Sequence, residues 1–364
     1  AAAMCYTSGT TGRSKGVVYS HRAIVLHSMN CCGVDSLGIS MRDTILPVTS
    51  LFHANGWGIP FTSAMAGAKV VLGGPFADGE GLLDLMEQER VTVTTGVPTV
   101  WFGALQALEK FPGRWKFTWP IRMHLGGAAT SEALMRGFDR RGITVVCSWG
   151  MTEMTPVGTS CHLRPQMDSW SEDQKYQQRT KPGTPAALVE ARIVRPDGTR
   201  APHDGCSVGE IEVRGPWVAA AYYNMPEEAQ TWSDDGWLRT GDMGHIDEHG
   251  YLKLVDRSKD LIKSGGEWIS SVDLENVLMG HPAVKEAAVI GVSHPKWAER
   301  PLAVIVLKEG ATATPDELRE FLAARFAKWQ LPDAFVYEKA IPRTSVGKFM
   351  KSKLREQYAG WKWE

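Results

Sequence analysis

The sequence predicts an α/β protein, with a layered α/β domain that carries a β-rich subdomain and a small α+β domain at the carboxyl end. From Val17 to about Trp149, short β-branched runs alternate with amphipathic stretches, which is typical of a layered domain with largely parallel strands. Residues 183–255 contain short strands separated by Asp-Gly and His-Gly turns, which predicts the β-rich subdomain. After Asp256, helical and strand patterns mix again over about a hundred residues, enough for a compact domain.

The amino-terminal part is expected to alternate strands with helices. Short aliphatic runs predict strands at residues 17–19, 44–48, 69–72, 92–95, 122–125 and 144–147. Amphipathic spacing predicts helices at residues 23–30, 81–89, 98–109 and 131–139. Pro98 and Ser131 are residue types that favour the first positions of a helix.

After the layered domain, the expected secondary structure changes twice. Residues 168–181 are polar and charged and are predicted to form a surface loop. In the β-rich subdomain we expect strands at 189–194, 209–213 and 251–255. In the carboxyl-terminal part we expect helices at 272–279, 315–327 and 351–358, and strands at 287–292, 303–307 and 334–338.

The composition excludes several classes of partner. Lys and Arg together number 40 and Asp and Glu 41, which gives a formal net charge of -1 over 364 residues. This balance gives no basic surface for nucleic acid and no polybasic block for anionic lipid. Hydrophobic residues at 43% and charged residues at 22% are ordinary values for a globular protein.

The cysteines and the start of the chain indicate the cellular compartment of the protein. The six cysteines form no CxxC pair, and Cys31 and Cys32 are adjacent, so free thiols in a reducing cytosol are expected. No apolar run approaches the ~18 residues of a membrane-spanning helix, and no signal pattern opens the chain. We therefore expect a cytoplasmic protein.

The chain begins directly ahead of a glycine-rich loop, with no complete strand or helix before it, so we expect a longer amino-terminal segment in the parent protein.

The glycine-rich loop is the first candidate for chemistry. A run of small and hydroxyl residues offers many free backbone N–H groups that can surround an anion, and Lys15 adds a positive charge for phosphate oxygens. The run consists of Thr7, Ser8, Gly9, Thr10, Thr11 and Gly12. Its spacing differs from that of the common P-loop. A polar surface turn is the simpler interpretation of such a run alone. The lysine and the strand-like residues that follow favour phosphate binding.

A second motif follows an apolar strand and reads Ser148-Trp149-Gly150-Met151-Thr152-Glu153. Ligands of open α/β sheets bind beyond the carboxyl ends of the strands, so Glu153 could hold Mg²⁺ and Thr152 could bond a phosphate. Alone, the motif favours a loop with a helix-capping threonine.

A third constellation spans two segments. Gly236-Trp237-Leu238-Arg239-Thr240-Gly241-Asp242 would hold the Asp242 carboxylate at a Thr-Gly turn, where it can accept bonds from a ribose diol. The charged segment 256–260 and residues 262–267 follow it. Alternating charges at a composition boundary usually form a solvated linker, and such a linker can also serve as a hinge.

Three weaker signals complete the set. Residues 342–348 end in Gly347-Lys348, which alone is an unremarkable loop before a basic helix. His53 precedes an apolar segment that contains Trp57, although a lone histidine is more often a core residue. A glycine-rich turn after a predicted strand contains Gly126, Gly127, Ala128 and Ala129.

These motifs, in this order, resemble those of the adenylate-forming (AMP-binding) enzymes, most closely the medium- and long-chain fatty-acyl-CoA synthetases. The resemblance is densest over residues 259–274 and 294–302. Three departures are visible: Ser14 replaces a proline before Lys15, Trp149 replaces a tyrosine, and a proline expected at Ala129 or Thr130 is missing.

The resemblance implies two domains and a role for each motif. Residues 1–258 would form an AMP-binding domain, incomplete at its amino terminus, and residues 259–364 a mobile lid with its hinge at Lys259. The catalytic residues would be Lys348, Glu153, Thr152 and His53, with Thr7 and Glu153 near the metal ion. Nucleotide, acyl and CoA contacts would come from residues 7–12 and from Lys15, Gly127, Ala128, Trp149, Gly150, Met151, Asp242, Arg257, Lys259, Gly265, Gly266, Glu267 and Trp57.

The implied reaction joins a carboxylic acid to the α-phosphate of MgATP, giving acyl-AMP and pyrophosphate, and then transfers the acyl group to coenzyme A. A medium- or long-chain fatty acid is the expected acid, and the full-length parent is expected to be a homodimer. Alternatives are a short sulfur-containing acid such as methylmercaptopropionate, an aryl acid, a carrier-protein-loading adenylation domain, or a non-catalytic nucleotide-binding fragment. No nucleic-acid partner is expected.

Overall fold

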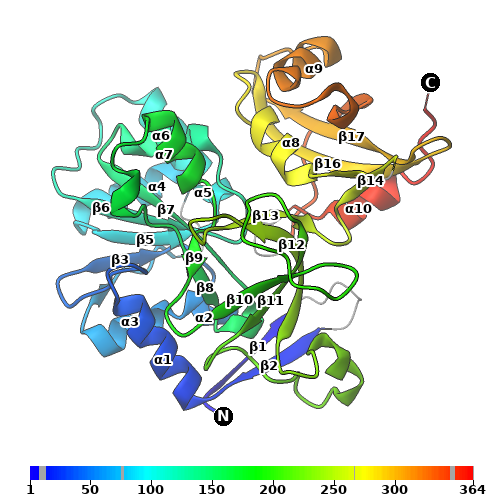
Figure 1. The fold of residues 1–364 in the computed structure, drawn as a ribbon. Coiled ribbons are helices and arrows are strands. Elements are labelled where there is room, and N and C mark those ends of the chain that lie inside the picture. Colours follow the sequence, from blue (N-terminus) through cyan, green and yellow to red (C-terminus); the bar gives the residue numbers. More distant parts are fainter. Residues whose placement is uncertain (8–13, 75–77, 266, 345–348, 364) are drawn as a thin grey trace. The chain divides into compact units, whose positions relative to one another are not determined.

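The computed structural model describes residues 1–7, 14–74, 78–265, 267–344 and 349–363 (Figure 1). It confirms the α/β class. The chain forms two compact units: the first comprises Ala1–Thr240 and His245–Lys253, and the second comprises Gly241–Gly244 and Leu254–Glu364. No helix in the described part of the chain is long and apolar enough to cross a membrane.

A seven-stranded sheet forms the centre of the first unit, with the strand order β4-β3-β5-β6-β7-β8-β9. The predicted strands are present, and their pairing is parallel from β4 to β7 as expected. Strands β8 and β9 add an antiparallel edge. The strand bounds are Lys69–Val70 (β4), Thr44–Pro47 (β3), Val93–Gly96 (β5), Ile121–Leu125 (β6), Ile143–Gly150 (β7), Val157–Ser160 (β8) and Thr184–Pro185 (β9).

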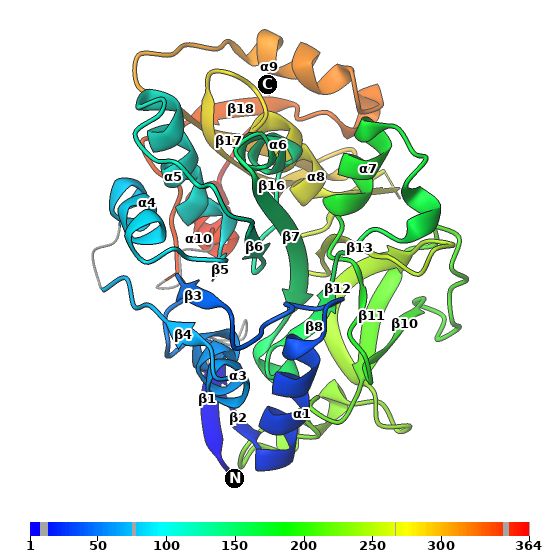
Figure 2. The same cartoon turned by 90° about the vertical axis from the view of Figure 1, so that its left-hand side faces the viewer.

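Helices pack against this sheet and bury the large apolar side chains of the first unit. Helices α4 and α5 lie side by side (Figure 2). Trp101, Phe138 and Met86 are fully buried in the core that they share with the sheet. Ser131 caps α6, as its residue type predicted, by accepting a hydrogen bond from the Leu134 N–H. The helix bounds are His21–Cys32 (α1), Ala54–Trp57 (α2), Ile59–Ala66 (α3), Gly79–Gln88 (α4), Pro98–Lys110 (α5) and Glu132–Asp139 (α6).

The prediction of a surface loop at residues 168–181 is wrong, because helix α7 (Glu172–Arg179) occupies most of it. The helix begins with a capping box between Ser171 and Gln174, a signal that is present in the sequence. It lies beside α6 (Figure 1), where the Tyr176 hydroxyl and the Arg179 guanidinium both donate to Asp139. Polar contacts with α6 therefore hold a helix that has almost no apolar face.

The expectation of no complete strand ahead of the glycine-rich loop is also wrong. Strand β1 (Ala3–Thr7) pairs antiparallel with β2 (Lys15–Tyr19), with Thr7 opposite Lys15. The loop therefore connects the two strands of a hairpin. Most residues of β1 lack strong strand propensity, and pairing with β2 outweighs that weakness.

The β-rich subdomain is confirmed as a four-stranded sheet with the order β10-β11-β12-β13. Its strands are Glu190–Val194 (β10), Gly209–Arg214 (β11), Leu238–Ile246 (β12) and Leu252–Arg257 (β13). Asp242 was expected at a Thr-Gly turn, and this was wrong because it lies inside β12. Gly241 has a φ of 71°, which a glycine adopts without strain, so the strand continues through the Thr-Gly pair.

The second unit contains a sheet with the order β15-β14-β17-β16, and β18 pairs in parallel with β17. The predicted helices and strands of this part are present, although α9 ends earlier than expected. Its elements are β14 (Ile262–Ser264), β15 (Glu267–Ile269), α8 (Ser271–Leu278), β16 (Val284–His294), β17 (Ala298–Leu307), α9 (Pro315–Ala323), β18 (Ala334–Tyr337) and α10 (Lys351–Gln357).

The buried imidazole of His27 on α1 should make the first unit sensitive to acid. Its Nε2 accepts a hydrogen bond from the Val157 N–H at 3.2 Å, and burial lowers the pKa of His27 to about 4. An unfolded histidine titrates near pH ~6.5, so the unfolded chain binds the extra proton as the pH falls from there towards 4. The free energy of unfolding should therefore fall with falling pH, by about 2 kcal/mol between pH 7 and pH 5.

His27→Gln keeps a hydrogen-bond acceptor but removes the titration, so it should flatten the pH dependence by the share of His27 and leave that of His124, whose pKa burial lowers to about 3 in the same unit. Urea unfolding at pH 7, 6 and 5 measures the effect. His21→Gln, at an exposed position on the same helix, is the matched control. Equal flattening in both variants would mean that burial of His27 is not the cause.

Candidate functional site

The described part of the glycine-rich loop places its lysine against an acid and an aromatic ring. The Lys15 Nζ lies 2.7 Å from the Glu228 Oε2 and 4.9 Å from the ring centre of Tyr222. The Lys15 side chain is 13% exposed, so the ion pair is partly withdrawn from water. Thr7 ends β1 opposite Lys15. Ser8, Gly9, Thr10, Thr11 and Gly12 lie outside the described residues.

Thr152 and Glu153 lie in a buried turn directly after β7. They belong to a 3₁₀ turn at Thr152–Met154, and both are almost inaccessible to solvent. The Tyr19 hydroxyl donates to the Thr152 carbonyl oxygen at 2.7 Å, which ties this turn to the β1–β2 hairpin. The backbone N–H of Ala219 donates to the Glu153 carbonyl oxygen at 2.7 Å.

Tyr222 joins the lysine to the acidic turn. Its hydroxyl donates to the Glu153 Oε1 at 2.6 Å, while its ring faces the Lys15 ammonium group. Burial, followed by the charge of Glu153, raises the pKa of Tyr222, so the hydroxyl remains a donor at any ordinary pH. A cation and a carboxylate from two separate motifs are therefore held by one tyrosine.

Trp149, Gly150 and Met151 form the end of β7 and its exit. The Trp149 side chain is only 7% exposed. A Cβ atom at Gly150 would lie 1.9 Å from the Pro156 carbonyl oxygen, so only glycine fits there. The Met151 N–H donates to the same oxygen at 3.1 Å. These contacts fix the direction in which the chain leaves the sheet towards Glu153.

Trp57 and the glycine-rich turn lie close together. His53 is half-buried and precedes α2, whose last residue is Trp57. A Cβ atom at Gly126 would lie 3.4 Å from the Trp57 ring and 2.8 Å from the Ser148 carbonyl oxygen. Gly127 and Ala128 follow at an exposed position. The Trp57 ring therefore reaches the carboxyl end of β6.

The two residues assigned to ribose are in contact within the second unit. The Arg257 Nε lies 3.2 Å from the Asp242 Oδ1, and the Asp242 side chain is 11% exposed. This contact joins the adjacent strands β12 and β13. The sequence order alone places them far apart, and the sheet brings them together.

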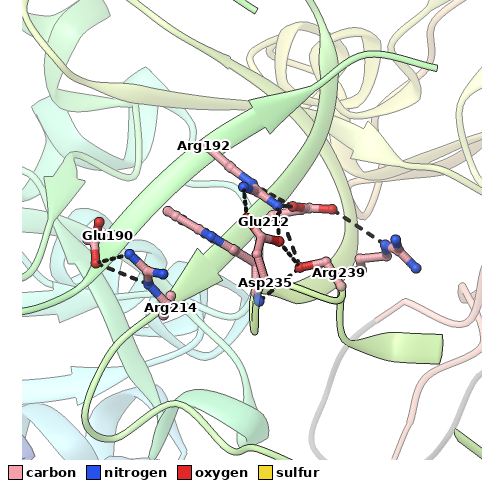
Figure 3. A network of polar contacts seen from close by, with 8 residues as sticks. Glu190, Arg192, Glu212, Arg214, Asp235 and Arg239 are labelled. Carbon is pink, nitrogen blue, oxygen red and sulfur yellow. Dashed lines mark hydrogen bonds and ion pairs between the residues drawn. The ribbon is translucent and has the colours of Figure 1, made fainter. Parts of the chain in front are cut away.

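An arginine–carboxylate network holds the start of β12 to β10 and β11 (Figure 3). Arg192 pairs with Glu212 and Asp235, and Arg214 pairs with Glu190. The ring of Trp237 is 4% exposed and has both guanidinium groups nearby, 4.4 and 4.7 Å from its centre. The network also lines a pocket of about 590 Å³. It anchors the strand that continues to Asp242.

The remaining candidates belong to the second unit. Lys259 lies in an exposed turn after β13, Gly265 follows β14 with a φ of 62°, and Glu267 begins β15. A Cβ atom at Gly265 would lie 3.0 Å from the Trp297 ring. Gly266 and Lys348 lie outside the described residues.

Three residues that contact the candidate site were not predicted from the sequence. Tyr19, Tyr222 and Glu228 each reach a predicted residue from another element. The tyrosine pair at 222–223 and the acidic residues that follow are visible in the sequence. Their spacing from Lys15 and Glu153 carries no signal, because only folding brings these segments together.

The donor set would suit a metal ion that takes a single carboxylate from the protein. Among the described residues, no three His, Cys, Asp or Glu side chains are grouped so that they could hold a metal ion. Mg²⁺ commonly binds proteins through one or two carboxylates and completes its shell with phosphates and water. Glu153 is a buried carboxylate with one oxygen bonded to Tyr222, so it fits that mode.

Family models match most of the chain. A model described as "AMP-binding enzyme" matches residues 1–223, and one described as "AMP-binding enzyme C-terminal domain" matches residues 273–348. The chain is 49% identical over 360 residues to the long-chain-fatty-acid–CoA ligase of Thermus thermophilus. It is 45% identical over 359 residues to the 3-methylmercaptopropionyl-CoA ligase of Ruegeria pomeroyi. Each alignment covers 98% of this chain and 66% of the relative, so the chain spans about two thirds of these proteins.

Solved structures agree with these matches. The crystal structure of ATP-bound MatB from Rhodopseudomonas palustris superposes with a TM-score of 0.83 at 31% identity, covering 98% of this chain and 68% of that one. The anthranilate CoA ligase AuaEII in complex with anthranoyl-AMP superposes with a TM-score of 0.85 at 26% identity, covering 97% of this chain and 66% of that one.

Proposed function

The chain belongs to the AMP-binding enzyme family, and on that basis we propose that it is the larger part of an acyl-CoA synthetase. The acid would attack the α-phosphate of MgATP, releasing pyrophosphate and forming acyl-AMP. The CoA thiol would then displace AMP to give the thioester. The observation that supports this best is the convergence of Lys15 and Glu153 on Tyr222, because it gives one place a cation for phosphate and a carboxylate for Mg²⁺.

The nucleotide would be held by residues from several elements. Lys15 and the loop at Thr7–Gly12 would neutralise the phosphates, and Thr152 would bond the α-phosphate. Glu153 would bind the Mg²⁺ that accompanies ATP. Trp149, Gly150 and Met151 would line the adenine pocket, and Asp242 and Arg257 the ribose. Lys348 would stabilise the charge that develops during adenylation.

Before nucleotide binds, Glu228 compensates the charge of Lys15. A triphosphate carries several negative charges and would attract the Lys15 ammonium group away from a single carboxylate. Glu228 therefore keeps the lysine folded against Tyr222 and close to where the phosphates would bind.

The second step would use the second unit. A rotation at Lys259 would withdraw Lys348 and bring Gly265, Gly266 and Glu267 towards the acyl group. His53 and Trp57 would close the acyl pocket, with Gly127 and Ala128 along its wall. The full-length protein would be a homodimer.

We propose a medium- or long-chain fatty acid as the substrate. The relative in Thermus thermophilus is named for a long-chain fatty acid, and one in Ectopseudomonas oleovorans for a medium-chain acid. The relative in Ruegeria pomeroyi is named for 3-methylmercaptopropionate, so a short sulfur-containing acid is the second candidate. An aryl acid, a carrier-protein partner and a non-catalytic role are the remaining alternatives.

Mass spectrometry of products separates these possibilities. The chain is offered ATP, Mg²⁺, CoA and a mixed panel of carboxylic acids. An acyl-CoA product would support the proposal and identify the acid. AMP and enzyme-bound acyl-AMP without thioester would favour a carrier-protein partner. Nucleotide binding without any AMP formation would overturn the proposed reaction for this chain.

Tyr222→Phe should slow adenylation about three- to tenfold, because the Glu153 carboxylate loses a buried hydrogen bond that fixes its orientation. ATP–pyrophosphate exchange measured at a series of Mg²⁺ concentrations tests this, and the variant should need more Mg²⁺. Tyr223→Phe is the control, since that neighbouring side chain is 51% exposed. Wild-type exchange in Tyr222→Phe would exclude a positioning role for its hydroxyl.

A further inference from the structure

A buried ionic cluster in the second unit joins the end of β13 and the residues that follow it to two helices. The Lys351 Nζ on α10 lies 2.7 Å from the Glu275 Oε1 on α8, and both side chains are about one tenth exposed. Lys351 also donates to the Ser271 hydroxyl. Ser271 donates to the Asp256 Oδ2 through its hydroxyl, and its N–H donates to the same oxygen at 2.9 Å. Asp256 is thus linked to Lys351 through one serine.

The same segment has two more contacts with these helices. The Ser270 hydroxyl, which caps α8, donates to the Val255 carbonyl oxygen at 2.5 Å. The Arg355 Nη1, one helical turn after Lys351, lies 2.5 Å from the Asp260 Oδ1. Residues 255–260 are therefore bound at both ends.

Burying these charged groups costs free energy, so we expect the cluster to have a structural role. Burial raises the pKa of Asp256, and burial raises the pKa of Glu275 to about 7. Lys351 opposes both shifts through its positive charge. A buried ion pair often adds little to stability compared with apolar packing, but it fixes one arrangement of the elements that carry it.

Because the cluster spans Lys259, it restricts backbone rotation at that residue. Asp256 lies before the proposed hinge, and Asp260 directly follows it. Asp256 is bonded to Ser271 of α8 and Asp260 to Arg355 of α10, and both helices lie after the hinge in the chain. A backbone rotation at Lys259 turns the residues before it relative to those after it. Such a rotation preserves the Asp260–Arg355 contact, and it separates Asp256 from Ser271 when Asp256 stays with β13.

We propose that Asp256, Ser271 and Lys351 form a latch that holds one of the two conformations of the catalytic cycle and must open in the other. Asp256 is thus a positioning residue that sets the balance between adenylation and thioester formation. This inference rests on the proposed two-step function. The balance between adenylation and thioester formation would then depend on a contact through Ser271. This contact is not one of the nucleotide and acyl contacts named above.

Two variants weaken the latch while the cluster keeps its main ion pair. Ser271→Ala removes the hydroxyl that links Asp256 to Lys351, and Asp256→Asn removes the charge but keeps an acceptor. Lys351 and Glu275 remain paired in both. Thr314→Ala is the matched control, because Thr314 caps α9 in the same unit, outside this cluster. Adenylation is measured by ATP–pyrophosphate exchange, and thioester formation by CoA consumption from synthetic acyl-AMP.

In the latch variants the ratio of the two rates should change about fivefold or more, since losing one buried hydrogen bond shifts a two-state population by that order. The direction of change identifies the conformation that the latch holds. The control should keep the ratio within about twofold. A wild-type ratio in both latch variants, or a parallel fall of both rates, would overturn the proposal.

Trypsin gives a readout that needs no activity. Arg257 and Lys259 are exposed cleavage points within the latched segment. Cleavage after them should be several-fold faster in Ser271→Ala than in the wild type and in Thr314→Ala, because cleavage follows local opening. Unchanged cleavage would overturn the latch. Absence of both half-reactions in the wild type would instead count against the proposed function, so the two failures are distinguishable.

Discussion

Lys348→Ala should lower ATP–pyrophosphate exchange by about 10²- to 10³-fold and leave thioester formation from synthetic acyl-AMP within about twofold. The ammonium group is proposed to neutralise charge that grows on the phosphate only during adenylation. Removing it therefore raises the barrier of that step and leaves the attack of the CoA thiol unchanged. Both rates are measured on the same preparation, so the loss of one step is compared directly with the other.

The control for this variant lies on the helix that follows. Lys353→Ala removes an exposed lysine of α10 and should leave both rates near those of the wild type. If Lys348→Ala lost both half-reactions equally, or if Lys353→Ala were as damaging, the assignment of Lys348 to the adenylation step would be wrong.

Lys259→Pro should slow thioester formation about ten- to a hundredfold and leave adenylation near the wild-type rate, as expected when a conformational step limits turnover. A proline fixes φ near −65° and restricts the residue before it, so the segment loses the freedom that rotation needs. Within the described residues, the Lys259 N–H donates no backbone hydrogen bond, so the proline removes none. The measurement is a pair of single-turnover rates, one for each step.

Lys259→Ala distinguishes the backbone effect from the charge effect. It removes the same ammonium group but keeps the freedom of the backbone, so thioester formation should stay within about threefold of the wild-type rate. Equal slowing by alanine and proline would assign the effect to the lost charge. Equal loss of both half-reactions in the proline variant would contradict the two-conformation account.

The sequence predicted the elements whose signals are local. The parallel strands β3, β5 and β6 and the helices α4 and α5 carry their own periodicity, and the structure has them within a few residues of the prediction. Helix α7 was missed because it is almost entirely polar, although the Ser171–Gln174 capping box marks its start. Strand β1 was missed because its pairing with β2, more than its composition, makes it a strand.

The candidate site was predicted in part for the same reason. Lys15, Glu153, Asp242 and Arg257 could be proposed from the sequence because each lies in a short motif with a recognisable spacing. Tyr222 carries no such motif, and its importance becomes visible only when its hydroxyl meets Glu153 and its ring faces Lys15.

The sequence by itself determined the class of fold, the order of the motifs and the family, because these depend on residue types that are close together in the chain. Only the tertiary structure decided which side chains share a site. It paired Lys15 with Glu228, Asp242 with Arg257, and Asp256 with Ser271. Such contacts depend on strand pairing and helix packing between distant segments, and the free energy that selects them belongs to the whole fold rather than to any one stretch of residues.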